Sequence, residues 1–328
     1  MPSEPSSTSL LGSFVVTVCV SFMLYGIMVA QSYFYMLNGA KRDSWWLKGM
    51  VLAVWILEVF HTALVIHMVY EYLVRDFTDL ADVGFIVWSV GLFVMVEMVI
   101  VGLVQGFYLR RIFLLSGRSY LITGVTGFLL LLRIALGFAT AALTYPLGQW
   151  VKFRQATGPL VTLSMGLGLA ALVDALIAGI LIFQLHRSKT GFSSTDGVIR
   201  SLMAYLVNTG AITGVVSLAI VLSFVCLEEN LLFAGLATVT AKLYSNSLLG
   251  TLNTREALRS KTGRVVEIPT MLSDLSNSQP QRAITGPTTE VSGLSGATEI
   301  QVFKETHKFS DFASEDERRS TSEAKAAL

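Results

Sequence analysis

Cysteine and charged residues are both scarce in this chain of 328 residues. The two cysteines, Cys19 and Cys226, are too few for a disulfide framework or for a cysteine-based zinc site. Charged residues make up only 14% of the chain, whereas soluble globular proteins carry about 25%. The shortage of charge therefore excludes an ordinary soluble domain.

Hydrophobic residues are correspondingly abundant, at 53% of the sequence with a mean hydropathy of +0.62. They occur in long blocks, each close to the roughly 20 residues that a helix needs to cross a bilayer. The sequence therefore predicts an all-α, polytopic membrane protein with a bundle of seven transmembrane helices. The blocks cover residues 11–37, 47–73, 84–109, 120–145, 160–185, 200–227 and 230–251.

Basic residues are distributed unequally between the two sides of the predicted bundle. One side carries only Arg75, Lys152 and Arg154, and the other carries many more. Since Lys and Arg accumulate in cytoplasmic loops, we expect an extracytoplasmic N-terminus and a cytoplasmic C-terminus, in the plasma membrane rather than an internal one. The basic residues on the rich side are Lys41, Arg42, Lys48, Arg110, Arg111, Arg118, Arg187, Lys189 and Arg200.

The two ends of the chain differ from its middle. Residues 1–10 form a short segment that we expect outside the cytoplasm, and residues 11–256 hold the bundle. Residues 257–328 are rich in Ser, Thr, Glu and Lys and poor in aromatic residues, so they cannot bury enough apolar surface to fold alone. We expect them to form a disordered cytoplasmic tail.

A few polar and charged side chains fall inside the predicted spans. Three acids and two bases in one bundle indicate a paired network, because an unpaired charge in hydrocarbon is costly. Two interpretations of this network are possible: a polar core with a structural role, and a pathway for a ligand or an ion. The candidate network comprises Glu58, His61, Glu97, Arg133, Asp174, Asn208, Lys242 and Asn246, and Gln105 is a further polar residue of the third block.

Lys242 is the most informative member of this set. Asn246 follows it at four residues and so lies on the same helix face. We expect Lys242 to face the bundle interior and to pair with an acid of another span, with Asp174 as first choice and Glu58 and Glu97 next. The alternative is a lysine that extends toward the cytoplasmic interface.

The polar residues of the predicted spans do not match a zinc site or a retinal-binding site. Glu58 and His61 share a helix face and could contribute to a metal site, but the third to seventh predicted spans contain no histidine. A hydrolytic zinc needs three protein ligands. The sequence around Lys242 also lacks the pattern of a retinal-binding lysine. We therefore expect no metal, no cofactor and no enzymatic activity.

Four motifs of the chain are shared with a known group of sequences. They run from Trp55 to Leu73, Gln105 to Ser116, Leu185 to Gly210 and Lys242 to Arg255, the last beginning Lys-Leu-Tyr-Ser-Asn-Ser-Leu-Leu. In these motifs, residues 11–256 resemble seven-span membrane proteins of mushroom-forming (basidiomycete) fungi with a domain of unknown function, here at 170–256. The resemblance implies the fold and the membrane location, and it supplies no substrate, ligand or catalytic residue.

The sequence leaves two function classes open. A receptor-like or sensor protein fits seven spans with a long cytoplasmic tail, although the Asp-Arg-Tyr and Asn-Pro-x-x-Tyr motifs of ordinary G-protein-coupled receptors are absent. The alternative is a small-molecule or proton-coupled transporter that uses the intramembrane acids, but no internal repeat supports it. The expected partners are the lipid bilayer, a small-molecule ligand and a cytoplasmic partner of the tail, without nucleic acid.

Overall fold

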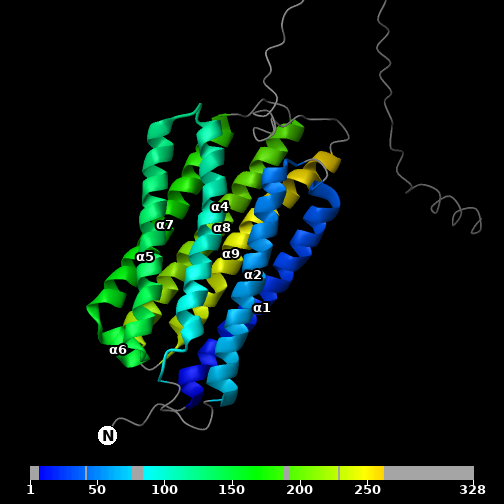
Figure 1. The fold of residues 1–328 in the computed structure, drawn as a ribbon. Coiled ribbons are helices and arrows are strands. Elements are labelled where there is room, and N and C mark those ends of the chain that lie inside the picture. Colours follow the sequence, from blue (N-terminus) through cyan, green and yellow to red (C-terminus); the bar gives the residue numbers. More distant parts are fainter. Residues whose placement is uncertain (1–6, 41–42, 76–83, 188–192, 228–229, 262–328) are drawn as a thin grey trace, which may run out of the picture. The chain divides into compact units, whose positions relative to one another are not determined.

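The computed structural model describes residues 7–40, 43–75, 84–187, 193–227 and 230–261 (Figure 1). Most of the N-terminal segment 1–10 and nearly all of the expected tail 257–328 lie outside these residues. The expectations for both segments therefore stay predictions.

The described residues form long helices with short connections. A bilayer offers no hydrogen bonds to the backbone, so apolar blocks of this length are stable there as helices. Gly148, which has a φ of 61°, ends α5 in the left-handed conformation. The elements are α1 (Ser7–Phe34), η1 (Tyr35–Gly39), α2 (Trp45–Tyr70), η2 (Glu71–Arg75), α4 (Trp88–Leu115), α5 (Tyr120–Leu147), α6 (Trp150–Gln155), α7 (Thr157–Arg187), α8 (Ser193–Cys226) and α9 (Leu232–Lys261).

The long helices pack as a closed ring. Each of α1, α2, α4, α5, α7 and α8 lies beside the next long helix of the chain, and α9 closes the ring by packing against α1. Helix α9 also reaches α2 and α4, which places it close to the middle of the bundle. In Figure 1, α1 begins at the lower end of the bundle and α9 ends at the upper end.

Six of the described helices are long and apolar enough to cross a membrane, which makes this a multi-pass membrane protein. The prediction of seven such helices is wrong, because α9, which covers the expected seventh block, is not among them. None of the residues 231–255 is exposed. Helix α9 is covered by protein, so its surface is not required to be apolar. It instead carries polar residues that contact its neighbours.

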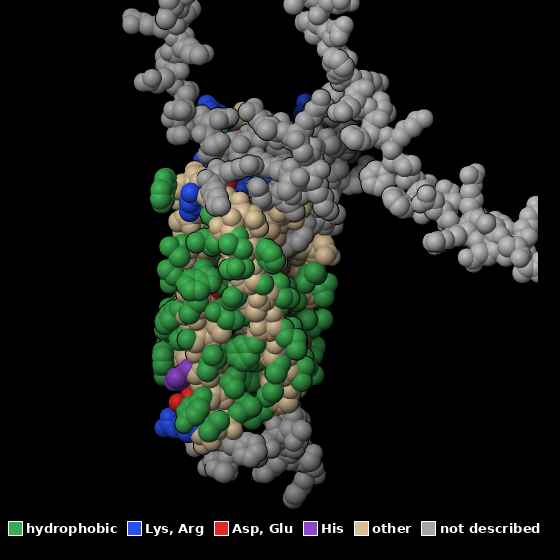
Figure 2. Space-filling view, turned by 90° about the vertical axis from the view of Figure 1, so that its right-hand side faces the viewer, with side chains coloured by type: hydrophobic (Ala, Val, Ile, Leu, Met, Phe, Trp, Pro, Cys, Tyr) green, Lys and Arg blue, Asp and Glu red, His purple; other side chains and the backbone are tan. Residues whose placement is uncertain are grey.

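The outer surface of the bundle is apolar along its length. On the face shown in Figure 2, hydrophobic side chains cover the long middle part and Lys and Arg appear near the ends. The end where α9 finishes holds the larger share of the described basic residues. These are Lys48, Arg110, Arg111, Arg118, Arg187 and Arg255 at that end, against Arg75, Lys152 and Arg154 at the other.

Helices α1 and α9 approach each other closely. A Cβ atom added to Gly235 would lie 1.9 Å from Thr17 Oγ1 and 3.1 Å from the Phe14 Cα, so only glycine fits there. Further along the same seam, Ser21 Oγ donates a 2.8 Å hydrogen bond to the carbonyl of Thr238. Asn253 Nδ2 donates another, of 2.8 Å, to the carbonyl of Gln31. Close packing and polar contacts together hold α9 against the first helix.

Aromatic residues close the end of the bundle where α1 begins. The rings of Trp150, Phe153, Phe224 and Phe233 pack edge to face, with centroids 5.2–6.0 Å apart. Arg154 lies over Phe233, 4.6 Å from the ring centroid, and donates hydrogen bonds to carbonyls at the end of α8. This aromatic cluster separates the polar interior from that end.

Candidate functional site

Lys242 lies in a fully buried polar cluster between α9 and α2. Its Nζ donates hydrogen bonds to a carboxylate oxygen of Glu58 and to Thr62 Oγ1, the latter at 2.8 Å. His61 Nδ1 lies 3.2 Å from the same nitrogen. Ser245, on α9, donates to the other Glu58 oxygen at 2.5 Å. Both charges are thus paired and hydrogen-bonded, which is the condition for keeping an ion pair in a low-dielectric interior.

The partner of Lys242 corrects the first choice made from the sequence. Lys242 pairs with Glu58, whereas the sequence favours Asp174 as its partner. The reason is geometric, because α9 packs against α2 through the face that carries Lys242. The side chain also lies over the ring of Tyr25 on α1, with Nζ 5.3 Å from the centroid. Lys242 therefore points into the bundle.

Asp174 is the centre of a second cluster, which joins four helices. Its carboxylate accepts hydrogen bonds from Gln105 Nε2 on α4 at 2.6 Å and from Thr213 Oγ1 on α8 at 2.7 Å. The hydroxyl of Tyr244 on α9 donates a third, of 2.6 Å. Asp174 itself belongs to α7. A carboxylate with three donors is well satisfied without a lysine.

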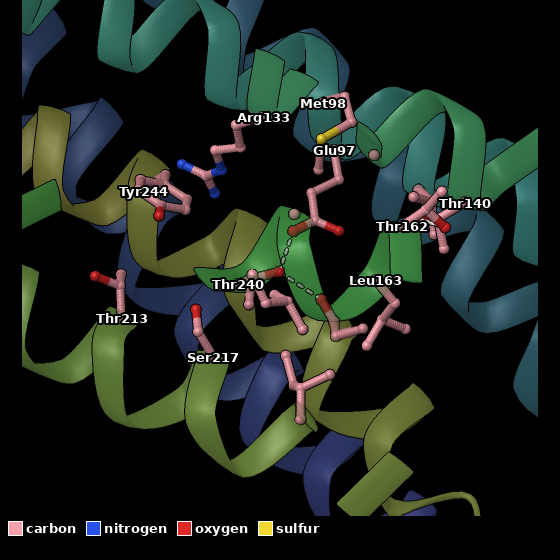
Figure 3. A pocket seen from close by; sticks show the side chains of 16 residues that line it. Glu97, Met98, Arg133, Thr140, Thr162, Leu163, Thr213, Ser217, Thr240 and Tyr244 are labelled. Carbon is pink, nitrogen blue, oxygen red and sulfur yellow. Dashed lines mark hydrogen bonds between the residues drawn. The ribbon is translucent and has the colours of Figure 1, made fainter. Parts of the chain in front are cut away.

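Arg133 and Glu97 both line a cavity, and Figure 3 shows Arg133 beside Tyr244 and Glu97 beside Thr240. Both are buried, with 5% and 6% of their surface exposed. The guanidinium of Arg133 lies 4.9 Å from the centre of the Tyr244 ring, and its Nη1 has no hydrogen-bond partner in the described part of the chain. Glu97 accepts a hydrogen bond from Thr240. No ion pair links Arg133 to Glu97 among the residues described.

The cavity measures about 100 Å³ and lies between α4, α5, α7, α8 and α9. Its lining combines the two charged groups with hydroxyls and with apolar side chains. Ile220 and Ala237 of this lining lie one helical turn from Phe224 and Phe233 of the aromatic cluster. The hydroxyl-bearing residues of the lining are Thr140, Thr162, Thr213, Ser217, Thr240 and Tyr244.

A second and smaller cavity of about 30 Å³ lies beyond Tyr244 and Thr213, which line both spaces. It is bordered by Asp174 and by Tyr108, whose hydroxyl lies 2.9 Å from Ser247 Oγ. Tyr108 also contacts Thr251 Oγ1 at 3.2 Å. Polar groups thus continue from the first cavity toward the end of the bundle where α9 finishes.

Two members of the predicted network lie outside these clusters. Asn246 donates from Nδ2 to the carbonyl of Leu24 at 2.9 Å, so it belongs to the seam between α1 and α9. Asn208 is exposed, and its placement in the interior network was wrong.

Several partners in the site were absent from the predicted network, chiefly the hydroxyl residues Thr62, Ser245, Thr213 and Thr240. Hydroxyl residues are common in membrane helices, so each one alone carries little signal. Helical spacing would have identified two of them, since Thr62 follows Glu58 by four residues and Ser245 follows Lys242 by three. The described residues contain no group of three or more His, Cys, Asp or Glu side chains arranged for a metal.

One family model matches part of the chain. It is described as "Family of unknown function (DUF6534)" and covers residues 170–257. The matched segment contains Asp174, Thr213, Thr240, Lys242 and Tyr244, whereas Glu58, Glu97 and Arg133 precede it. Five of these eight residues of the polar interior thus lie in a segment similar to this domain. Neither a curated protein nor a solved structure matches the chain.

Proposed function

We propose that this membrane protein is a receptor-like sensor that binds a small molecule in the cavity between Arg133 and Glu97. The observation that carries the proposal is the buried Arg133 side chain, which belongs to the lining of the cavity and whose Nη1 has no hydrogen-bond partner among the described residues. A buried donor left unpaired costs free energy, and a ligand that supplies an acceptor would recover it.

The position of the cavity also favours sensing. Five helices line it, so a bound molecule would change the relative stability of their packing arrangements. The aromatic cluster closes the side toward the start of α1, and hydrogen-bonded groups continue toward the opposite end. A ligand in the cavity would therefore be coupled to the end where α4, α7 and α9 finish.

The alternative function is transport, and one observation favours it. The two cavities share Tyr244 and Thr213, so a rearrangement of these side chains would join them into a longer polar path. Transport requires such a path to open alternately to the two sides of the membrane.

The test uses purified protein in lipid nanodiscs, with both native cysteines replaced by serine. A Tyr120→Cys variant carries an environment-sensitive fluorophore, because Tyr120 is exposed at the start of α5, at the end remote from the aromatic cluster. A library of small polar compounds is screened for an increase in melting temperature. A sensor is expected to change its fluorescence with a stabilising compound, and this response should be lost in Arg133→Gln.

The same compounds are then tested for uptake into liposomes that contain the protein. Uptake that depends on Arg133 and occurs with each stabilising compound would support the transporter in place of the sensor. A library in which no compound stabilises the protein or changes its fluorescence would contradict both functions.

We further propose that α9 crosses the membrane inside the bundle, with the N-terminus outside and the C-terminus in the cytoplasm of a plasma-membrane protein. The opposite ends at which α1 begins and α9 finishes support this, as does the accumulation of basic residues where α9 finishes. Protease added to intact cells should spare a C-terminal tag and remove an N-terminal one. Cleavage of the C-terminal tag would contradict this topology.

A further inference from the structure

We infer that the ligand of the cavity is a small zwitterion, with its carboxylate bound by Arg133 and its ammonium group bound by Glu97. This inference rests on the proposed small-molecule function and names the chemical class of the ligand.

Arg133 determines the acidic end of the ligand. Its nearest candidate acceptors inside the bundle are already in use, since Asp174 accepts three hydrogen bonds and Glu97 accepts one from Thr240. The guanidinium carbon lies 4.9 Å from the centre of the Tyr244 ring, and Nη1 has no hydrogen-bond partner among the described residues. A carboxylate is the group that matches a guanidinium edge, because two parallel hydrogen bonds can form.

Glu97 determines the basic end. Thr240 donates to one of its oxygens, and Glu97 lines the same cavity as Arg133 (Figure 3). No lysine or arginine pairs with Glu97 in the described part of the chain, because Lys242 is paired with Glu58. An ammonium group in the cavity would supply the missing counter-charge and up to three donors.

A zwitterion offers a counter-charge to each of the two charged groups that line the cavity, whereas a simple ion offers one to a single group. Lys242 and Glu58 form a pair of zero net charge, which leaves Arg133 beside Glu97 and Asp174. A monoanion at Arg133 would be repelled by two carboxylates, and a monocation at Glu97 would leave the guanidinium unpaired. A zwitterion satisfies both ends and adds no net charge to a low-dielectric interior.

The size of the cavity limits the length of the ligand. A water molecule needs roughly 10–15 Å³ of such volume, so a cavity of about 100 Å³ holds roughly seven to ten non-hydrogen atoms. This range fits the small α-amino acids and short amino acids with separated charges. The hydroxyl of Ser217, which also belongs to the lining, remains for a polar substituent.

The experiment measures the melting temperature of the full chain in nanodiscs against named probes. Glycine, L-alanine, L-serine and 4-aminobutanoate vary the separation of the two charges, and propionate and propylamine each carry one charge alone. At least one zwitterion should stabilise the protein in a concentration-dependent way, and neither simple ion should. Arg133→Gln and Glu97→Gln should each weaken that binding at least about tenfold.

Two glycines of α7 provide a test that does not remove a charge. Gly166 lines the cavity, and a Cβ built there would lie 3.5 Å from Leu136 Cβ, so Gly166→Leu places a bulky side chain in the cavity wall between α5 and α7 and should strongly weaken binding. Gly168 is outside the lining and has nothing within 4 Å of its Cβ position, so Gly168→Leu is the matched control and should bind normally.

The possible results separate this inference from the proposed sensor. Simple ions that bind as well as zwitterions, zwitterions that all fail to bind, or zwitterion binding that persists in Gly166→Leu would overturn the ligand class. If an uncharged compound changes the fluorescence at Tyr120→Cys and is blocked by Gly166→Leu, the sensor stands and the zwitterion is wrong. A zwitterion that binds without any fluorescence change supports the ligand class and contradicts the sensor.

Discussion

Lys242→Met is expected to lower the free energy of unfolding by about 3–5 kcal/mol, because it leaves the buried Glu58 carboxylate without its cation. Ser245 would still donate to Glu58, and His61 would remain near the vacated position. Neither replaces a full positive charge. The measurement is reversible unfolding by SDS in mixed micelles, followed by circular dichroism.

A double variant identifies the partner. Glu58→Gln combined with Lys242→Met removes both charges and should recover much of the lost stability, because the uncompensated charge is gone. Asp174→Asn combined with Lys242→Met should give no such recovery, since Asp174 contacts Gln105, Thr213 and Tyr244 instead. A Lys242→Met single variant as stable as the parent would show that the pair contributes nothing to folding.

Asp174→Ala is expected to lower the free energy of unfolding by at least about 3 kcal/mol, because three buried donors lose their acceptor at about 1–3 kcal/mol each. The donors belong to α4, α8 and α9, so the variant loosens three helices from α7. The same SDS titration measures the effect.

Glu71→Ala is the matched control for this variant. Glu71 forms an ion pair of 2.9 Å with Arg75, whose side chain is 70% exposed, so its loss should cost less than about 1 kcal/mol. Equal losses of unfolding free energy in the two variants would show that the buried hydrogen bonds of Asp174 stabilise the protein no more than an exposed ion pair does.

The sequence predicted the helices well because their lengths follow from the bilayer. The block expected at 120–145 corresponds to α5 (Tyr120–Leu147), and the block at 47–73 corresponds to α2 and η2. The error concerned α9, which the sequence counts as a seventh apolar span. Composition alone does not reveal that a helix will be covered by its neighbours, since that depends on how all the helices pack.

The energetic cost of buried charge led correctly to a paired Lys242, but not to its partner. Choosing between Glu58 and Asp174 requires the rotation of each helix about its axis, and a single sequence does not contain that information. The same limitation explains Asn208, which was placed in the interior and is exposed. The cavity depends on the gap left between five helices, which no local pattern encodes.

The enclosure of α9 has a consequence for biosynthesis. The ribosome makes this helix after the six apolar ones, yet α9 supplies Lys242, Thr240 and Tyr244 to acids held on α2, α4 and α7. Until α9 packs against the other helices, those acids lack these partners, so a chain that stops before residue 232 keeps a buried Glu58 carboxylate without its lysine. Assembly of the polar interior is thus completed by the last helix that the structure describes.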